Sequence, residues 1–235
     1  MTSLTYAVPD LHGRDDLLEA AIAAISDRGG GRVVFLGDYV DRGPGSRQMI
    51  ERLMAGPPED QDWIILKGNH EDMMVETCRG RAVPDWWIGN GGGATLVSYG
   101  HPRSGVADLT VVPAEHLAWI SGLSLAFADE HRVYAHAGVD PTLPLGEQTA
   151  KTLTWKRYPK GFDGGCGELH VVHGHTPNQE GPERFSRRTN LDALAWYTGR
   201  LAVGVFDDAV PGGPVEVLWI EGYPIEHLKP SCVAA

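Results

Sequence analysis

Five short apolar segments of this chain each end at residues whose side chains commonly bind metal ions. The segments cover residues 4–8, 32–36, 63–66, 132–135 and 169–172, and each has the length of a buried β-strand. The residues that follow them are Asp10, His12, Asp38, Asn69, His70, His136, His173 and His175. Because the same pattern recurs five times, we expect the strand ends to converge on one site whose chemistry depends on a metal.

The segments between these strands predict an α/β fold. Apolar residues at helical spacing occur over 17–25, over a helix beginning near Pro44, and over 70–79. This alternation is typical of a sheet with right-handed crossovers, in which ligands bind beyond the carboxyl ends of the strands. Further along the chain we expect a short helix at 113–119 and a hairpin loop at 207–214. We also expect strands at 122–128, 186–191, 200–206 and 215–220.

The length of 235 residues predicts a single domain over 1–235. Residues 81–105 interrupt the pattern with Trp86, Trp87, four glycines and Tyr99, which indicates an insertion over the site or a small helical cap. Aromatic side chains there could stack on a substrate or pack within the cap. We treat the chain as a monomer, because no feature of the sequence indicates an oligomer.

Charge and cysteine content bound the partners and the compartment. The formal net charge of −11 disfavours binding to nucleic acid or to an anionic membrane. No apolar stretch approaches the roughly 20 residues that span a bilayer. Cys78, Cys166 and Cys232 are few and far apart, so we expect reduced thiols and a cytoplasmic location.

The first two strand ends offer carboxylates and an imidazole. Asp10 and His12 are two residues apart, so both side chains can reach one cation. Asp38 follows the second strand, where a carboxylate can bridge two ions, and Arg42 offers a fork of donors suited to phosphate. An acidic loop with a local salt bridge explains this second segment equally well.

The remaining strand ends add neutral donors. Asn69 has an oxygen suited to a divalent ion, whereas His70 points elsewhere and suits a general acid better than a ligand. His136 and His175 each follow a strand and lie next to a glycine or alanine. His173 could orient a ligand or a metal-bound water, or it could be a core histidine.

Five motifs occur in one order along the chain: Asp10-Leu11-His12-Gly13, GDYVDRG at 37–43, GNHE at 68–71, HAG at 136–138 and GHTP at 174–177. Over about residues 4–206 the chain resembles the phosphoprotein phosphatase branch of the calcineurin-like metallophosphoesterases. It is most similar to the compact bacterial and bacteriophage-lambda serine/threonine protein phosphatases. Pro177, where the wider superfamily often has a histidine, points to the same branch. The resemblance implies a four-layer αββα sandwich of two mixed β-sheets flanked by helices.

The resemblance also implies a role for each site residue. Asp10, His12 and Asp38 would hold a first metal, and Asp38, Asn69, His136 and His175 a second. His70 would protonate the leaving group while Asp41 orients its ring. Phosphate would be bound by Arg42, by Arg157 in the segment Trp155-Lys156-Arg157, and by Lys67. The two ions would be divalent transition metals, with manganese first and iron or zinc as alternatives.

The function implied is hydrolysis of phosphoserine or phosphothreonine in proteins, by in-line attack of a hydroxide that two metals activate. Glu71 and the complete GDYVDRG favour this reading over a symmetrical dinucleoside tetraphosphate hydrolase, which shares the ligand set. A phosphatase for small phosphoesters is a third possibility. A catalytically silent module that binds phosphoproteins would be expected to lack ligands or the acid, and this chain has them all.

Overall fold

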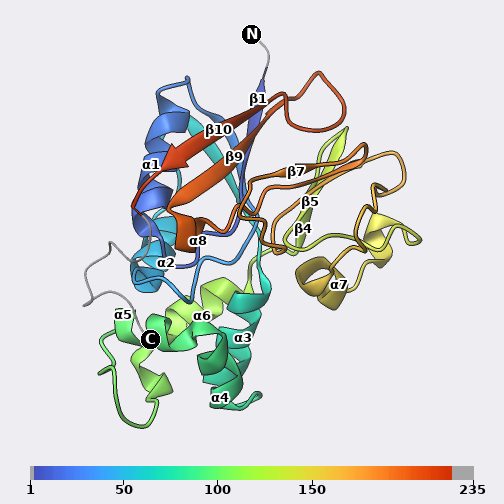
Figure 1. Cartoon of the computed structure of the whole chain (residues 1–235). Helices are drawn as coiled ribbons and strands as arrows, with labels where there is room; N and C mark the ends of the chain where they lie inside the picture. Colours follow the sequence, from blue (N-terminus) through green and yellow to red (C-terminus); the bar gives the residue numbers. More distant parts are fainter. Residues whose placement is uncertain (1–2, 224–235) are drawn as a thin grey trace.

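The computed structural model describes residues 3–223, and its first β-sheet carries three of the five strand ends (Figure 1). The strand order is β10-β9-β1-β2-β3, with β1, β2 and β3 parallel and β9 and β10 antiparallel to their neighbours. The parallel ladders bring the carboxyl ends of three consecutive strands to one edge of the sheet. The strands are β1 (Leu4–Val8), β2 (Gly31–Phe35), β3 (Gln61–Ile65), β9 (Arg200–Asp207) and β10 (Glu216–Glu221).

A second mixed sheet carries the other two strand ends. Its order is β4-β5-β6-β8-β7, with β5, β6 and β8 parallel to one another. The strands are β4 (Ala126–Ala128), β5 (Arg132–Ala135), β6 (His170–His173), β7 (Glu183–Arg184) and β8 (Arg188–Asn190).

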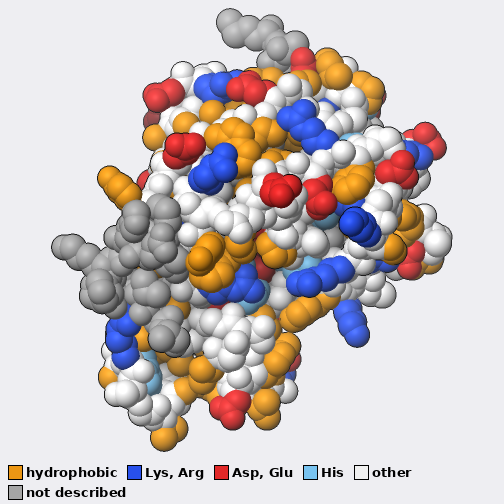
Figure 2. Space-filling model, in the orientation of Figure 1, with side chains coloured by type: hydrophobic (Ala, Val, Ile, Leu, Met, Phe, Trp, Pro, Cys, Tyr) orange, Lys and Arg blue, Asp and Glu red, His pale blue; other side chains and the backbone are white. Residues whose placement is uncertain are grey.

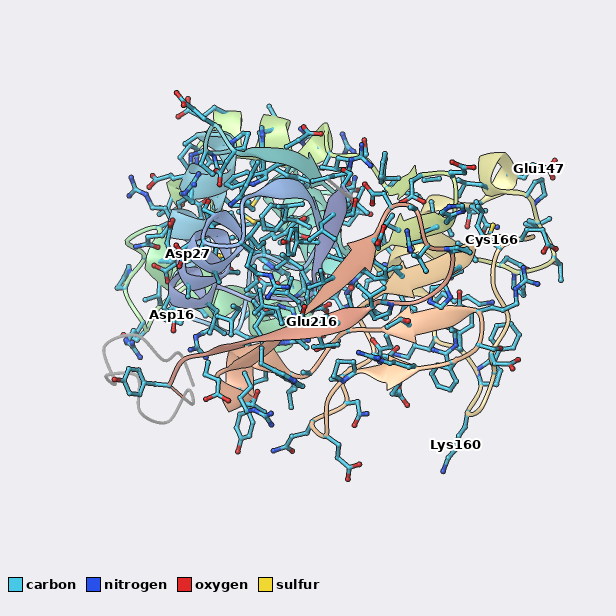
Figure 3. All side chains as sticks on the ribbon, turned by 90° about the horizontal axis from the view of Figure 1, so that it is seen from above. Asp16, Asp27, Glu147, Lys160, Cys166 and Glu216 are labelled. Atoms are coloured by element: carbon cyan, nitrogen blue, oxygen red, sulfur yellow. The ribbon has the colours of Figure 1, made fainter. Side chains whose placement is uncertain are left out.

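The alternation of side chains along the strands builds three apolar layers. Residues from both sheets meet in a central cluster of Ala7, Val34, Leu36, Leu66, Tyr134, Val172, Leu191 and Phe206. The opposite face of the first sheet packs on α1 (Asp15–Ser26) and α2 (Ser46–Met54). The outer face of the second sheet packs near α7 (Ala150–Trp155). The resulting layers, helix, sheet, sheet and helix, are those expected from the sequence, and Figure 3 shows side chains filling the space around the strands.

A group of helices lies at the ligand-bearing end of the first sheet, below the sheets in Figure 1. It comprises α3 (Asn69–Cys78), α4 (Pro84–Trp87), a π-helical turn (Ile88–Gly92), α5 (Gly93–Ser98) and α6 (Ala114–Ser121). The aromatic and glycine-rich segment 81–105 is therefore helical over much of its length. It contacts α2 and α3.

Some boundaries differ from the sequence prediction. The strand predicted over 122–128 forms only at Ala126–Ala128, and Ser124 makes an isolated bridge to Leu66, the residue after β3. The strand predicted over 186–191 is confined to Arg188–Asn190. Cys78 and Cys166 are free thiols, while Cys232 lies outside the described residues. Among residues 3–223, no helix is long and apolar enough to cross a bilayer.

Candidate metal centre

The five strand ends converge at one buried site. Asp10 and His12 follow β1, Asp38 follows β2, and Asn69 and His70 begin α3 directly after β3. His136 follows β5 and His175 follows β6, so the second sheet completes the set. Each of these seven side chains is less than 9% exposed. Figure 2 shows histidine atoms near the centre of one face, bordered by arginine or lysine and by hydrophobic side chains.

Two groups of donor atoms share the carboxylate of Asp38. The first group consists of His12, Asp38 and His70, and the second of Asp38, His136 and His175. Within each group, the potential ligand atoms lie within 4.8 Å of one another. Asn69 extends the second group, since its Oδ1 lies 2.9 Å from His136 Nε2 and 3.0 Å from His175 Nδ1. This arrangement suits two ions bridged by Asp38.

Asp10 belongs to neither compact group. Its carboxylate accepts a hydrogen bond from the backbone amide of His175, at 3.0 and 3.2 Å to its two oxygens. A Cβ at Gly174 would lie 2.0 Å from Asp10 Oδ1, so only glycine allows this approach. Asp10 therefore joins the end of β1 to the end of β6. Burial is the largest cause that raises the pKa of Asp10, and the nearby carboxylates of Asp192 and Asp38 raise it further.

The protonation of the imidazoles fits a metal. Burial, followed by the charge of His136, lowers the pKa of His175 to about 3. Burial also lowers the pKa of His12 and of His136. The neutral imidazole is the form that donates a lone pair to a metal. A mixed set of nitrogen and oxygen donors suits a divalent transition ion.

The guanidinium of Arg42 contacts two imidazoles of this site. Its Nη1 lies 2.5 Å from His12 Nε2 and its Nη2 lies 3.0 Å from His70 Nε2. The guanidinium cannot accept a proton, so both imidazole nitrogens must be the acceptors. A metal bound by His12 would take the same lone pair. Arg42 could then no longer donate to His12, and its guanidinium would be available to bind phosphate.

Asp41 holds the ring of His70. Its Nδ1 lies 2.6 Å from Asp41 Oδ2, which leaves Nε2 facing the site. Burial alone would lower the pKa of His70, but Asp38 and Asp41 together raise it. Once Arg42 no longer donates to Nε2, this raised pKa would let His70 hold a proton there, although the same atom could also serve as a ligand.

The helical segment 81–105 holds Asp41 in place, which sequence reasoning missed. The indole Nε1 of Trp87 donates to both oxygens of Asp41 at 2.9 and 3.0 Å, and Thr95 Oγ1 donates to Oδ1 at 2.7 Å. Trp87 is fully buried. The segment thus contributes directly to the orientation of His70.

Glu71 organises the loop that carries Asp38. Its carboxylate accepts hydrogen bonds from four backbone amides, those of Asp38, Tyr39, Val40 and Gly68, at 2.8 to 3.2 Å. It is fully buried, so it does not face a substrate. Its effect on the site is to fix the position of Asp38.

Backbone strain marks the same residues. Six non-glycine residues in the described part of the chain have positive φ, and five of them belong to the motifs: His12, Asp38, Asp41, Arg42 and His175. Left-handed backbone is costly for such residues and is concentrated at functional sites. Gly37 has φ +107°, and a Cβ there would lie 2.5 Å from the amide nitrogen of Gly68.

Asp192 is a further acidic residue that sequence reasoning missed. It is 5% exposed, and burial is the main cause that raises its pKa to about 6. It is near enough to Asp10 to raise the pKa of that carboxyl as well. Asp192 follows β8 by two residues, so the strand-end rule applied to this strand would have found it.

Three other predicted residues lie at different distances from the centre. Arg157 is exposed, and its charge helps to lower the pKa of His175, which places it at the rim. The ammonium of Lys67 lies 2.8 Å from Asp72, and its role in binding phosphate stays a prediction. His173 hydrogen-bonds to the carbonyl oxygen of Gly174 and to Arg188, and its role in orienting a ligand stays a prediction.

Fold and site together define a metal-dependent phosphoesterase. The family model described as calcineurin-like phosphoesterase matches residues 5–204, and the chain belongs to this family.

Similar proteins and structures carry several activities. The chain is 28% identical over 185 residues to the asymmetrical bis(5'-nucleosyl)-tetraphosphatase PrpE of Bacillus mycoides, covering 72% of this chain and 73% of that protein. The same enzyme of Bacillus thuringiensis is 26% identical over 189 residues, with the same coverage of both chains. A crystal structure provisionally described as a diadenosine tetraphosphatase has a TM-score of 0.66 at 21% identity and covers 95% of each chain. A serine/threonine phosphatase from Saccharomyces cerevisiae has a TM-score of 0.63 at 15% identity, covering 98% of this chain and 83% of that one, which shows a shared fold.

Proposed function

We propose that this chain hydrolyses dinucleoside tetraphosphates asymmetrically, using two divalent ions bridged by Asp38. The observation that carries the hydrolase assignment is the pair of donor groups sharing Asp38, with Arg42 and His70 beside them. The substrate is proposed from the similarity to bis(5'-nucleosyl)-tetraphosphatases named as asymmetrical. Asymmetrical cleavage differs from the symmetrical cleavage that the sequence motifs suggest as an alternative.

The bound ions and the arginines of the site would have different roles in this hydrolysis. Two bound ions would polarise the phosphoryl oxygens and supply an activated water. We propose manganese as the first candidate for these ions, with iron or zinc as alternatives. Arg42 and Arg157 would bind phosphate oxygens as charge develops on them. Water attacks the phosphorus next to one nucleoside, the bond from that phosphorus to the bridging oxygen breaks, and AMP and ATP are released.

The leaving group decides how much His70 matters. In the cleavage of diadenosine tetraphosphate the leaving group is ATP, whose phosphate oxygen departs as a stable anion. A serine alkoxide needs a proton as it leaves. His70, oriented by Asp41, would therefore matter most with alkyl phosphates.

A serine/threonine protein phosphatase is the second candidate. The complete GDYVDRG motif favours it. Glu71 also favours it in the sequence, and in the structure its carboxylate accepts hydrogen bonds from four backbone amides. The presence of the donor set with Arg42 and His70 disfavours a silent phosphoprotein-binding module.

Assay of the purified chain with manganese tests the proposal. Diadenosine tetraphosphate, a phosphoserine peptide and an alkyl phosphate are compared at equal enzyme concentration, and nucleotide products are separated by ion-exchange chromatography. We expect AMP and ATP in equal amounts. Two molecules of ADP would indicate symmetrical cleavage, and turnover of the phosphopeptide alone would favour the second candidate. We place this activity in the cytoplasm, in keeping with the free thiols of Cys78 and Cys166.

A further inference from the structure

Two exposed tryptophans stand next to each other at the rim of the metal centre. Trp86 is 43% exposed and Trp155 is 38% exposed. Their ring planes differ by 19° and their centroids are 6.2 Å apart. This spacing is within the range of offset stacking, roughly 4.5–7 Å. The pair therefore presents flat, apolar and partly open ring surface to a ligand.

The pair lies directly beside a proposed metal ligand. The ring of Trp155 meets the ring of His175 at 6.2 Å between centroids, with an interplanar angle of 76°. Trp155 is the last residue of α7, and Arg157 follows it by two residues. Arg157 also acts electrostatically on His175. A flat surface and a positive charge thus come from one segment at the edge of the site.

The segment that carries Trp86 is fixed to the catalytic loop. Its neighbour Trp87 is buried and donates to Asp41, as described above. The amide of Arg42 donates to the carbonyl oxygen of Gly91 at 3.1 Å. A Cβ at Gly92 would lie 2.5 Å from the Trp87 ring, so the turn packs closely on this indole. Trp86 is therefore held at a set place relative to Asp41 and Arg42.

We infer that Trp86 and Trp155 bind the nucleobase of a nucleotide substrate by stacking, while Arg157 contacts its phosphates. This inference rests on the proposed function and names the part of the site that would recognise the nucleoside. A nucleotide combines a flat ring with an anion, as this rim combines indole rings with a guanidinium. A phosphoserine side chain has no ring to stack.

AMP and ribose 5-phosphate differ only at C1 of the ribose, where AMP has adenine and ribose 5-phosphate has a hydroxyl, so their affinities test the inference. Calorimetric titration of the manganese-loaded full chain measures both dissociation constants. Stacking of one base is worth about 1–3 kcal/mol, or about 5- to 150-fold in affinity. We expect AMP to bind more tightly than ribose 5-phosphate by a factor in this range. Trp155→Ala and Trp86→Ala should each reduce the ratio, whereas Trp155→Phe should retain most of it.

The ratio is an internal control, because damage to the metal centre weakens both ligands alike. Thermal unfolding of each variant shows that it is folded. Equal binding of both ligands by the wild type, or a ratio unchanged in both alanine variants, would overturn the inference. Hydrolysis products report separately on the proposed function. If the chain cleaves only phosphopeptides but binds AMP more tightly than ribose 5-phosphate, the proposed function is wrong and the nucleobase site stands. If it cleaves dinucleoside tetraphosphates but both alanine variants keep the wild-type ratio of affinities, the proposed function stands and the nucleobase site is wrong.

Discussion

Replacing Trp87 by phenylalanine removes one donor from Asp41 while keeping an aromatic ring in the same buried place. The carboxylate of Asp41 accepts from Trp87, Thr95 and His70, all at 2.6 to 3.0 Å. A hydrogen bond to a charged group contributes about 1.5–3 kcal/mol, and the smaller ring leaves a void that costs about 1 kcal/mol more. We expect Trp87→Phe to lower the free energy of unfolding by about 2.5–4 kcal/mol.

The same change should weaken proton donation by His70. If about half of this hydrogen-bond energy, about 0.75–1.5 kcal/mol, is lost from the transition state through the misplaced Asp41, kcat for an alkyl phosphate falls about 4- to 13-fold. Nitrophenyl phosphate should lose much less, because its leaving group departs without a proton. The assay is steady-state kinetics with both substrates in manganese.

Trp63→Phe is the matched control. Its indole Nε1 also donates one hydrogen bond, to Gln61 Oε1 at 2.9 Å, and its ring packs on Phe35. We expect a smaller loss of stability and an unchanged ratio of the two activities. Equal losses for both substrates in Trp87→Phe would refute the argument that Trp87 acts through Asp41 and His70.

Three further predictions concern the same molecule. Gly37→Ala should lower the free energy of unfolding by at least about 2 kcal/mol, because of the positive φ and the close approach of Gly68; an unchanged denaturant midpoint would contradict this. His70→Asn should reduce kcat far more for alkyl phosphates than for diadenosine tetraphosphate, as stopped assays of both would show; equal reduction would argue against a proton donor. Burial and then Arg132 lower the pKa of His170 to about 4 from an ordinary 6.5. The unfolded chain therefore binds more protons between these values, so stability falls as pH drops from 6.5 to 4, and denaturant midpoints of metal-free His170→Gln should fall less than those of the wild type.

The strand ends were predictable because two simple rules act together. Buried parallel strands show as short apolar runs, and their carboxyl ends share one edge of a sheet. Asp38, His136 and His175 could therefore be placed in one site from sequence. The layers of the fold followed from the resemblance, and the structure bears them out.

The supporting contacts were not predictable, since they join segments far apart in the chain. The bond from Trp87 to Asp41 spans 46 residues, and nothing in the local pattern distinguishes buried Trp87 from exposed Trp86. The contacts of Glu71 were hidden for the same reason. Its identity was visible, but its four amide partners depend on how the loop after β2 folds over the start of α3.

The contacts of Lys67 and His173 could not be predicted from their positions in the motifs. Both lie within two residues of proposed ligands. The charge of Lys67 is nevertheless paired with Asp72, and the ring of His173 lies against Tyr158. The direction of each side chain sets these contacts, and it depends on neighbours that come from other segments.

Metal content measured together with turnover tests the shared role of Asp38 most directly. The wild type and Asp38→Asn are loaded with manganese, freed of excess ion by gel filtration, and analysed by inductively coupled plasma mass spectrometry and by hydrolysis of diadenosine tetraphosphate. Because Asp38 belongs to both donor groups, we expect two ions per chain in the wild type, and loss of both ions and of turnover in the variant. Wild-type turnover by Asp38→Asn without bound metal would contradict the account.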